Sequence, residues 1–260
     1  MRAESQVGAF FDIDGTLLPW PSLEWRFIAY LASRDILGPA AAAQSVSIAL
    51  GVLLSNVAVG VPLESGNRMY LSGLSTSLVD DWLPDLSRPL PVFDDGLRRL
   101  KWHASQGHRI VLISGTLAPL ARAFAQQIGL AAEIYATELD LVSSGGGEEH
   151  GIAVDFWTGH LASAWPNAQT KAHIVRRVAV EHHLDLAHSF AYGNSSADAA
   201  MLESVGNPRA VNPSFRLRRI AAGHHWTIEY WKLRAASRRP ANLARCSPTD
   251  PIVARIGDHR

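Results

Sequence analysis

Short apolar segments that alternate with helical patterns constrain the fold of this chain more than any other feature. Five such segments have the length and composition of strands buried on both faces of a parallel sheet: residues 7–11, 109–113, 133–136, 190–192 and 209–211. Apolar residues at helical spacing lie between the last four of them. The alternation predicts an α/β protein with a Rossmann-like, doubly wound parallel sheet that has helices on both faces.

The boundaries of the helices are expected at residues that favour N-caps. Four helix starts are predicted in this way: Ser22, Asp94 or Asp95, Thr170 and Ser214. The helix after Ser214 is expected to be the last element of the core. Residues 139–142 and 152–157 flank a glycine-rich segment and predict a hairpin or flap outside the sheet.

Only helical patterns occupy residues 20–90, between the first two strands. We therefore expect an all-helical cap at 20–90, inserted into a core formed by residues 1–19 and 91–231. Residues 232–260 contain seven basic and two acidic residues together with three prolines. They are expected to form a basic, loosely ordered tail.

An uncharged stretch lies inside the predicted cap, between Asp35 and Glu64. Residues 40–61 are long enough to span a bilayer if they are helical. Gln44, Asn56 and many small residues weaken insertion, however, so a buried helical hairpin is the favoured interpretation. A membrane span or a membrane-surface contact is the alternative.

Charge and cysteine content exclude several classes of function. The chain has 24 basic and 24 acidic residues, without the basic stripe expected of a nucleic-acid-binding protein. Cys246 is the single cysteine, which excludes an intramolecular disulfide and a thiolate metal cluster. No secretory signal is visible in residues 1–7, so a cytoplasmic location is expected.

Polar residues follow the predicted strands or begin the helices after them. Six of these could take part in chemistry: Asp12, Asp14, Ser114, Lys171, Asn194 and Asp198. Taken singly, each is more simply explained as a turn former, a helix cap or a solvated charge. Because the carboxyl ends of parallel strands meet at one edge of a sheet, we expect all six to gather there.

Such a group has the composition of a phosphoryl-transfer site. Of two carboxylates at positions 12 and 14, one can attack and the other can carry a proton. Oxygen ligands from Asp12, the Asp14 main chain and residues 194–198 suit Mg²⁺, which would let a carboxylate approach a phosphate. Lys171 would neutralise the remaining charge.

Over about residues 6–230 the sequence resembles the haloacid dehalogenase-like phosphohydrolases. Four segments carry the resemblance in order and spacing: Phe10-Phe-Asp-Ile-Asp-Gly-Thr-Leu17, Ile113-Ser-Gly-Thr116, Gln169-Thr-Lys-Ala172 and Tyr192-Gly-Asn-Ser-Ser-Ala-Asp198. The insertion between the first two is similar to the type 1 cap of the phosphoserine-phosphatase-like subfamily, often called IB. The resemblance implies a Mg²⁺-dependent phosphatase that acts on a small-molecule phosphomonoester.

The resemblance also implies roles for individual residues. Asp12 would attack phosphorus to give an aspartyl-phosphate, and Asp14 would protonate the leaving oxygen and then activate water. Phosphate oxygens would be held by Ser114, the Gly115 amide and Lys171, with Thr16 a further candidate for substrate binding. The ion would be held by Asp12, the Asp14 carbonyl, Asn194 and Asp198.

Two positions depart from the family pattern. Asn194 stands where a carboxylate metal ligand is usual, so weaker metal binding is expected unless Asp198 compensates. True phosphoserine phosphatases place a glutamate, which meets the substrate ammonium, nine residues after the nucleophile; here that residue is Pro21. Glu24, one helical turn further on, is a candidate substitute. The apolar cap indicates a larger or greasier substrate, such as a lipid phosphate.

Three alternative functions remain open from the sequence. The first is a phosphoserine phosphatase proper, and the second is a non-catalytic or membrane-tethered binding domain in which Asn194 marks lost metal affinity. The third is a phosphotransferase that moves phosphate to an alcohol. The adjacent histidines at 182–183 and 224–225 are interpreted as surface residues, because neighbouring side chains point to different sides and no third zinc ligand is suitably spaced.

Overall fold

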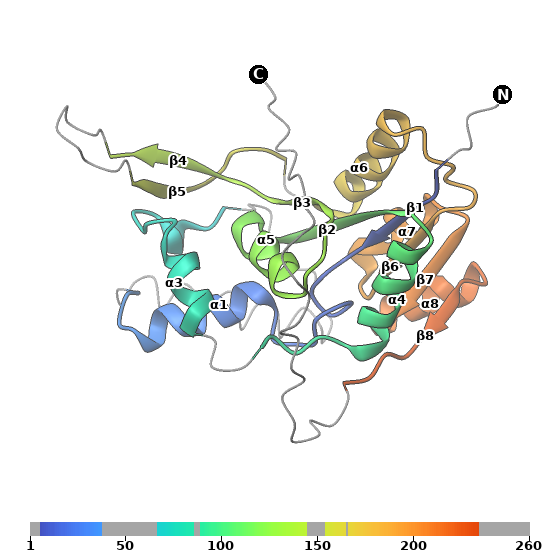
Figure 1. Ribbon diagram of the computed structural model, residues 1–260, viewed down its shortest axis with the longest axis horizontal. Helices are drawn as coiled ribbons and strands as arrows, with labels where there is room; N and C mark the ends of the chain where they lie inside the picture. Colours follow the sequence, from blue (N-terminus) through green and yellow to red (C-terminus); the bar gives the residue numbers. More distant parts are fainter. Residues whose placement is uncertain (1–5, 38–66, 86–88, 145–153, 165, 234–260) are drawn as a thin grey trace, which may run out of the picture.

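The computed structural model describes residues 6–37, 67–85, 89–144, 154–164 and 166–233. Its core is a six-stranded sheet in the order β3-β2-β1-β6-β7-β8, in which every neighbouring pair is parallel (Figure 1). The strands are β1 (Gly8–Phe11), β2 (Arg109–Leu117), β3 (Glu133–Thr137), β6 (Phe190–Gly193), β7 (Asn207–Val211) and β8 (Thr227–Glu229). The predicted α/β class and Rossmann-type parallel sheet are confirmed.

Strand β1 lies between β2 and β6, and helices cover both of its faces. All four of its residues are buried, as an unbroken apolar strand requires. Phe11 pairs in register with Leu112 of β2 and with Tyr192 of β6. The residues that follow these three partners therefore emerge side by side at the carboxyl edge of the sheet.

Helices pack on both faces of the sheet. They are α4 (Asp94–Ser105), α5 (Ala118–Gln127), α6 (Ala168–Glu181), α7 (Ala199–Glu203) and α8 (Phe215–Gly223). Phe10 packs with side chains of α6, α7 and α8, whereas Phe11 packs with side chains of α4 and α5. This split follows from the alternation of side chains along a strand, and it produces two hydrophobic layers.

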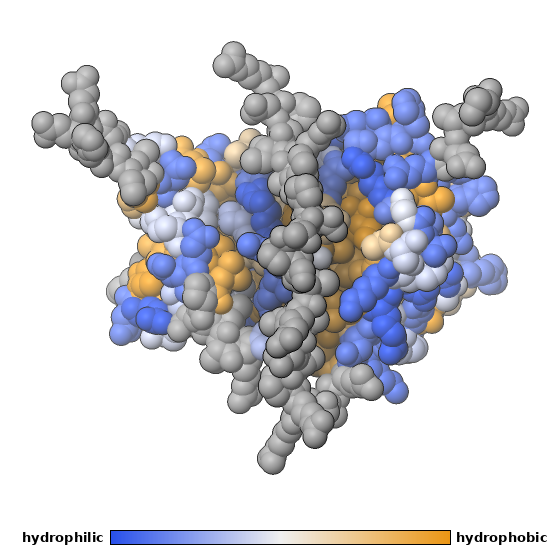
Figure 2. Space-filling model, in the orientation of Figure 1, coloured by the Kyte–Doolittle hydropathy of each residue, from blue (hydrophilic) through white to orange (hydrophobic). Residues whose placement is uncertain are grey.

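The described part of the predicted cap contains two α-helices and a short 3₁₀ helix: α1 (Leu23–Ser33), η1 (Met69–Leu71) and α3 (Leu78–Asp85). Residues 40–61, where a helical hairpin is predicted, lie outside the described residues. Within the described ranges, no helix is both long and apolar enough to cross a membrane. Hydrophobic and polar surface are interspersed on the face shown in Figure 2.

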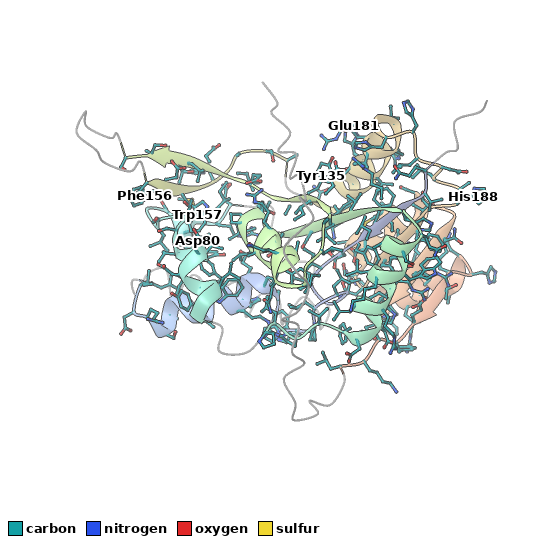
Figure 3. The ribbon with its side chains drawn as sticks, viewed as in Figure 1. Asp80, Tyr135, Phe156, Trp157, Glu181 and His188 are labelled. Atoms are coloured by element: carbon teal, nitrogen blue, oxygen red, sulfur yellow. The ribbon has the colours of Figure 1, made fainter. Side chains whose placement is uncertain are left out.

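A two-stranded antiparallel hairpin of β4 (Leu139–Ser143) and β5 (Asp155–Leu161) extends from the core beside the cap helices (Figure 1). Main-chain hydrogen bonds join it to the cap: the amides of Gly73 and Arg68 donate to Trp157 and Gly159, at 2.8 and 2.7 Å. The Trp157 side chain is buried against Phe27. Figure 3 shows Phe156 and Trp157 on the same side of the molecule as Asp80 of α3. The predicted hairpin is therefore attached to the cap.

Two of the predicted helix starts are wrong. Helix α4 has Phe93 at its N-cap position, and Asp95 accepts hydrogen bonds from Arg98 and from the Lys232 amide instead of capping. Helix α6 begins before Thr170, because the Asn167 side chain accepts from the amides of residues 169 and 170. At α6 the neighbouring Asn167 side chain takes the capping role. At α4 the distant Lys232 amide binds the Asp95 carboxylate that local preference would use as a cap.

Two predicted strands extend further than expected, and one strand was not predicted. Strand β2 continues to Leu117, with a register shift against β3 between Ile113 and Leu117. Strand β5 continues to Leu161, beyond the predicted end at Trp157, and residues 152–153 of the prediction lie outside the described residues. Strand β8, which was not predicted, follows α8. The buried Trp231 comes two residues after its end. The strand is only three residues long, too short for its alternation to stand out.

Candidate active site

Asp12 follows the buried strand β1 and has 5% of its surface exposed. Its amide donates to the Tyr192 carbonyl at 3.0 Å, which continues the pairing of β1 with β6. Its Oδ1 atom accepts a hydrogen bond from Lys171 Nζ at 2.7 Å, and its Oδ2 atom accepts from Thr16 Oγ1 at 3.1 Å. Both oxygens of the expected nucleophile are therefore held in fixed directions.

The loop after Asp12 requires glycine at position 15. The amides of Thr16, Leu17 and Leu18 all donate to the Ile13 carbonyl, which closes a tight turn. Gly15 has φ +87°, and a Cβ at this position would lie 2.0 Å from Asn194 Nδ2. The turn thereby brings the main chain at Gly15 against the side chain of Asn194.

Asp14 projects from the same turn toward the cap. Its Oδ1 atom accepts from the amide of Leu23, the first residue of α1, at 2.8 Å. Burial raises the pKa of Asp14 to about 7, and the hydrogen bond from Leu23 opposes that effect. A carboxyl group with a pKa near neutrality can both donate and accept a proton.

Lys171 lies in the first turn of α6 and has 4% of its surface exposed. Its ammonium is 2.7 Å from Asp12 Oδ1 and 2.6 Å from Asp198 Oδ1. Burial alone would lower the pKa of Lys171, but the two carboxylates outweigh it and raise that pKa, so the side chain is charged. Burial raises the pKa of Asp12 to about 6, and Lys171 counteracts this effect.

Asp198 organises the loop after β6. Its Oδ2 atom accepts from the amides of Asn194 and Ser195 at 3.1 and 2.9 Å, and from the Ser195 hydroxyl at 3.0 Å. With Oδ1 bound to Lys171, both of its oxygens are used within the protein. This role for Asp198, which orients Lys171 and the loop, was missed by the sequence reading, although the Ser195–Asp198 spacing is that of a capping box.

Ser114 and Gly115 lie in the irregular part of β2, facing the same edge. Ser114 is buried and its hydroxyl accepts from the Thr116 amide at 3.2 Å. The Gly115 carbonyl accepts from Thr137 Oγ1 at 2.7 Å and from Arg68 Nη2 at 3.4 Å. The register shift in β2 thus leaves the Gly115 carbonyl open to Thr137 of β3 and to Arg68 of the cap.

Glu24, in the first turn of α1, is held by two cap residues. Arg68 Nε and the Tyr70 hydroxyl both donate to its Oε1 atom. The structure therefore places the predicted ammonium ligand in an ion pair with a guanidinium. Arg68 and Tyr70 were missed by the sequence reading, since they stand 44 and 46 residues from Glu24 and no local pattern connects them.

The donors at the sheet edge suit a hard divalent cation. Asp12 Oδ2 and Asn194 Oδ1 lie beside the same hydroxyl, since Thr16 Oγ1 is 3.1 Å from the first and 3.4 Å from the second. The carboxylates of Asp12 and Asp198 both contact the single Lys171 ammonium, and the Asp14 carboxyl group is close enough to interact with Asp12, so acidic groups outnumber basic ones here. Oxygen ligands and excess negative charge are what Mg²⁺ requires.

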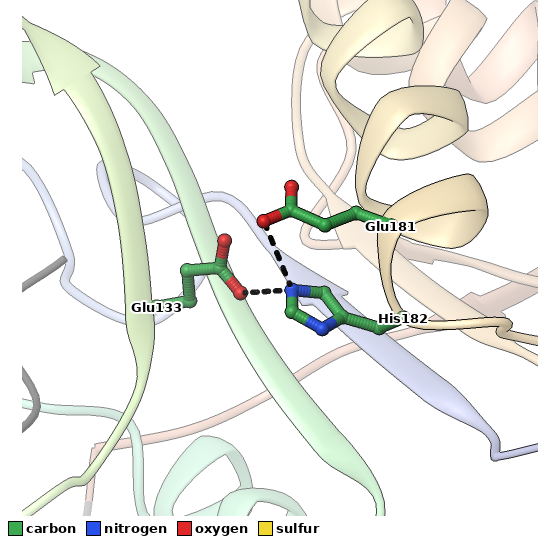
Figure 4. Close-up of side chains that lie close together, drawn as sticks. All are labelled: Glu133, Glu181 and His182. Carbon is green, nitrogen blue, oxygen red and sulfur yellow. Dashed lines mark ion pairs between the residues drawn. The ribbon is translucent and has the colours of Figure 1, made fainter. Parts of the chain in front are cut away.

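A second group of possible metal ligands lies at the opposite edge of the sheet, where Glu133, Glu181 and His182 meet (Figure 4). His182 Nε2 is 3.5 Å from Glu133 and 3.8 Å from Glu181. Arg109 contacts two members of the group: its Nη2 is 2.8 Å from His182 Nε2 and its Nε is 3.2 Å from Glu133. We interpret this group, together with Arg109, as a polar network that ties β2, β3 and α6 together.

Comparison with protein families gives a match to the haloacid dehalogenase-like hydrolases over residues 9–203. Among curated proteins, the chain is 30% identical to "Phosphoserine phosphatase SerB1" of Mycobacterium tuberculosis, covering 92% of this chain and 76% of that protein. It is 29% identical to the "Inhibition of morphological differentiation protein" of Streptomyces azureus, covering 97% and 89%.

Solved structures share the fold at lower identity. A protein of unknown function from Bordetella pertussis superposes with a TM-score of 0.68 at 22% identity, covering 86% of this chain and 98% of that one. A phosphoserine phosphatase structure described as a phospho-aspartyl intermediate analogue superposes with a TM-score of 0.58 at 15% identity, covering 88% and 95%. The matched family range contains every residue that the structure gathers around Asp12.

Proposed function

Because the chain belongs to the haloacid dehalogenase-like hydrolases, we propose that it hydrolyses a small-molecule or lipid phosphomonoester through an aspartyl-phosphate on Asp12. The observation that carries this proposal is the buried Asp12–Lys171–Asp198 chain of charges, with Asp14 two residues from the nucleophile. A carboxylate paired with an ammonium and a second carboxyl group of raised pKa are the groups that such a reaction needs.

The proposed first step transfers the phosphoryl group to the protein. An oxygen of Asp12 forms a bond to phosphorus while the bond from phosphorus to the leaving oxygen breaks, and Asp14 gives its proton to that oxygen. Lys171, the Ser114 hydroxyl and the Gly115 amide would hold the phosphoryl oxygens. Thr16 keeps the Asp12 carboxylate oriented through its 3.1 Å hydrogen bond.

The second step returns Asp12 to its starting state. Asp14, now ionised, takes a proton from water, whose oxygen forms a bond to phosphorus as the Asp12 oxygen–phosphorus bond breaks. Inorganic phosphate is released, and Asp14 is protonated again for the next turnover. The pKa of about 7 for Asp14 suits both directions of proton transfer near neutral pH.

Asp12, the Asp14 carbonyl, Asn194 and Asp198 are the residues proposed to hold Mg²⁺. When bound, the ion would reduce the repulsion between the carboxylate and the phosphate. Asp12 and Asp198 both accept hydrogen bonds at each of their oxygens, so a bound ion would share these oxygens with the present donors. Asn194 offers an amide oxygen without charge, and half-saturation at a high Mg²⁺ concentration is expected.

A second candidate is hydrolysis of phosphoserine itself. It is favoured by the name of the mycobacterial relative that is 30% identical. Pro21 stands at the position where the subfamily resemblance places an ammonium-binding glutamate, and Glu24 is paired with Arg68. We therefore propose the broader phosphomonoesterase activity as the primary function.

Phosphate release from a panel of phosphomonoesters tests the proposal. The panel contains phosphoserine, sugar phosphates, nucleotides and lysophosphatidate, each measured with Mg²⁺ and with EDTA. We expect Mg²⁺-dependent release that Asp12→Asn lowers by about three orders of magnitude or more. Asp140→Asn, an exposed change of the same kind on β4, serves as the matched control and should keep wild-type activity.

Equal inactivity of the wild-type and Asp12→Asn proteins at high Mg²⁺ would contradict the proposal. Asn194→Asp then separates two causes, since recovered activity would show a metal site weakened by one uncharged ligand. Continued inactivity would favour a binding domain. An excess of glycerol in the active assay detects transfer of phosphate to an alcohol, as a new phosphoester.

A further inference from the structure

Glu24, Arg68 and Tyr70 form a buried polar trio between the cap and the catalytic edge of the sheet. Tyr70 is 3% exposed, and the Arg68 and Glu24 side chains are 15% and 16% exposed. Arg68 Nε and the Tyr70 hydroxyl both donate to Glu24 Oε1. The three residues come from two elements, α1 and the segment that contains η1, so their meeting depends on the folded cap.

The trio lies beside the groups that the proposed reaction uses. Glu24 follows Leu23, whose amide donates to Asp14 Oδ1 at 2.8 Å, and the charge of Glu24 contributes to the raised pKa of Asp14. On its other side Arg68 Nη2 reaches the Gly115 carbonyl at 3.4 Å. Arg68 thus contacts the proposed phosphate-holding segment, and its partner Glu24 adjoins the residue that binds the proposed proton donor. The leaving group of a phosphate held at Ser114 and Gly115 would therefore lie close to Arg68.

We infer that Glu24 is a positioning residue for Arg68, not a ligand for a substrate ammonium, and that the site therefore selects phosphomonoesters whose leaving group carries no cationic group. The inference rests on the proposed function and deepens it by restricting the class of substrate. It also sets this chain apart from what the name of its phosphoserine phosphatase relative describes.

Electrostatics is the physical basis of the selection. Arg68 and Tyr70 both occupy Glu24 Oε1, so an ammonium would bind at the other oxygen of the same carboxylate, next to the guanidinium. Like charges that close repel each other more strongly where little water screens them. Tyr70 does not reduce the positive charge, because burial raises its pKa well above the usual value and the phenol stays neutral. A guanidinium instead favours hydroxyl, carbonyl or carboxylate oxygens on the leaving group.

Substrate pairs that differ only in the ammonium give a direct test with the wild-type protein. Phosphoethanolamine is compared with propyl phosphate, and phosphoserine with the phosphate ester of 3-hydroxyisobutyrate; in each pair a methyl group replaces the ammonium. We expect kcat/KM to favour the methyl member of each pair by about tenfold or more. A preference for the ammonium member in both pairs would overturn the inference.

Variants separate positioning from direct binding. Arg68→Gln should shift the preference toward the ammonium member of each pair, because the Glu24 carboxylate then lacks its guanidinium partner. Glu24→Gln should lower kcat/KM for both members, whereas a direct ammonium ligand would affect only the ammonium member. Arg98→Gln, an exposed substitution on α4, is the matched control and should change neither ratio.

Turnover of p-nitrophenyl phosphate keeps this inference separate from the proposed function. This ester has neither an ammonium nor a carboxylate, so it reports the Asp12 chemistry alone. Its hydrolysis together with a preference for ammonium substrates would refute the inference and leave the phosphatase proposal standing. Failure to hydrolyse any ester would refute the proposed function, and the inference with it. Thermal unfolding followed by circular dichroism shows that each variant is folded.

Discussion

At Gly15 the absence of a side chain allows the loop after β1 to touch the loop after β6. The φ of Gly15 is +87°, and a Cβ would meet the Asn194 side chain. Gly107 offers a matched comparison, since its φ is +70° and a Cβ there would have no neighbour within 4 Å. Substitution of Gly107 therefore tests the stability cost of the positive φ alone, whereas substitution of Gly15 adds the cost of a steric clash.

We expect Gly107→Ala to cost about 1–2 kcal/mol of unfolding free energy, the usual penalty for an L-residue in the left-handed region. Gly15→Ala should cost more, and it should also lower Mg²⁺-dependent phosphate release, because Asn194 must move away from Thr16. Urea denaturation and the phosphate assay measure the two effects. Equal stability losses and full activity in Gly15→Ala would show that the contact is unimportant.

His103 links helix α4 to strand β6 through a buried hydrogen bond. It is fully buried, and its ring nitrogens lie 2.9 Å from the Tyr192 hydroxyl and 2.8 Å from His108 Nδ1. Burial, with help from His108 and Arg99, lowers the pKa of His103 to about 3. The imidazole is therefore neutral in the folded protein under ordinary conditions.

A pH dependence of stability follows from this pKa. Between about pH 6.5 and pH 3 the unfolded chain binds a proton at His103 that the folded protein does not bind, so stability falls as the pH is lowered, by up to about 1.4 kcal/mol per pH unit. His103→Gln should flatten this dependence, whereas His173→Gln, on the exposed side of α6, should not. Unfolding free energies at pH 5 and pH 7 measure the difference, and identical slopes in all three proteins would contradict the assignment.

The order of elements could be predicted because its signals are local. Apolar runs such as 7–11 and 109–113 mark strands, and parallel pairing then brings Asp12, Ser114 and Asn194 to one edge. Helix starts were less predictable, because Asn167 outcompetes Thr170 and Lys232 engages Asp95 from far along the chain. The Arg68–Glu24 ion pair could not be predicted from local sequence patterns, because it joins residues 44 positions apart that meet only in the folded cap.

Across the whole molecule, Trp231 connects the last strand to the core. It is 6% exposed, and its ring lies 5.7 Å from that of Tyr192. Its amide donates to Asn212 Oδ1, its carbonyl accepts from Asn212 Nδ2, and its indole donates to Glu229 at 2.7 Å. Trp231, which follows the last predicted element, therefore packs against the sheet beside β7 and β8.

Trp231→Ala should lower the unfolding free energy by about 3–5 kcal/mol, as expected for removal of a buried aromatic side chain. Trp20→Ala is the control, because that side chain is 66% exposed and its loss should change stability by no more than about 0.5 kcal/mol. Urea denaturation monitored by circular dichroism measures both. A small effect at Trp231 would mean that β8 and the residues after it contribute little to the stability of the sheet.

The attachment of the β4–β5 hairpin to the cap has a consequence for how this protein can diverge. The main-chain amide of Arg68 is held by Gly159 of the hairpin, whereas Asp12, Lys171 and Asp198 are held by the sheet and α6. Mutations in the hairpin can therefore shift the Arg68 backbone while Asp12, Lys171 and Asp198 keep their own supports. In the proposed enzyme, substitutions in the hairpin would change the surroundings of Arg68, and with them the choice of substrate, while the groups around Asp12 stay the same. The hairpin is therefore a suitable region for a library selected for altered specificity.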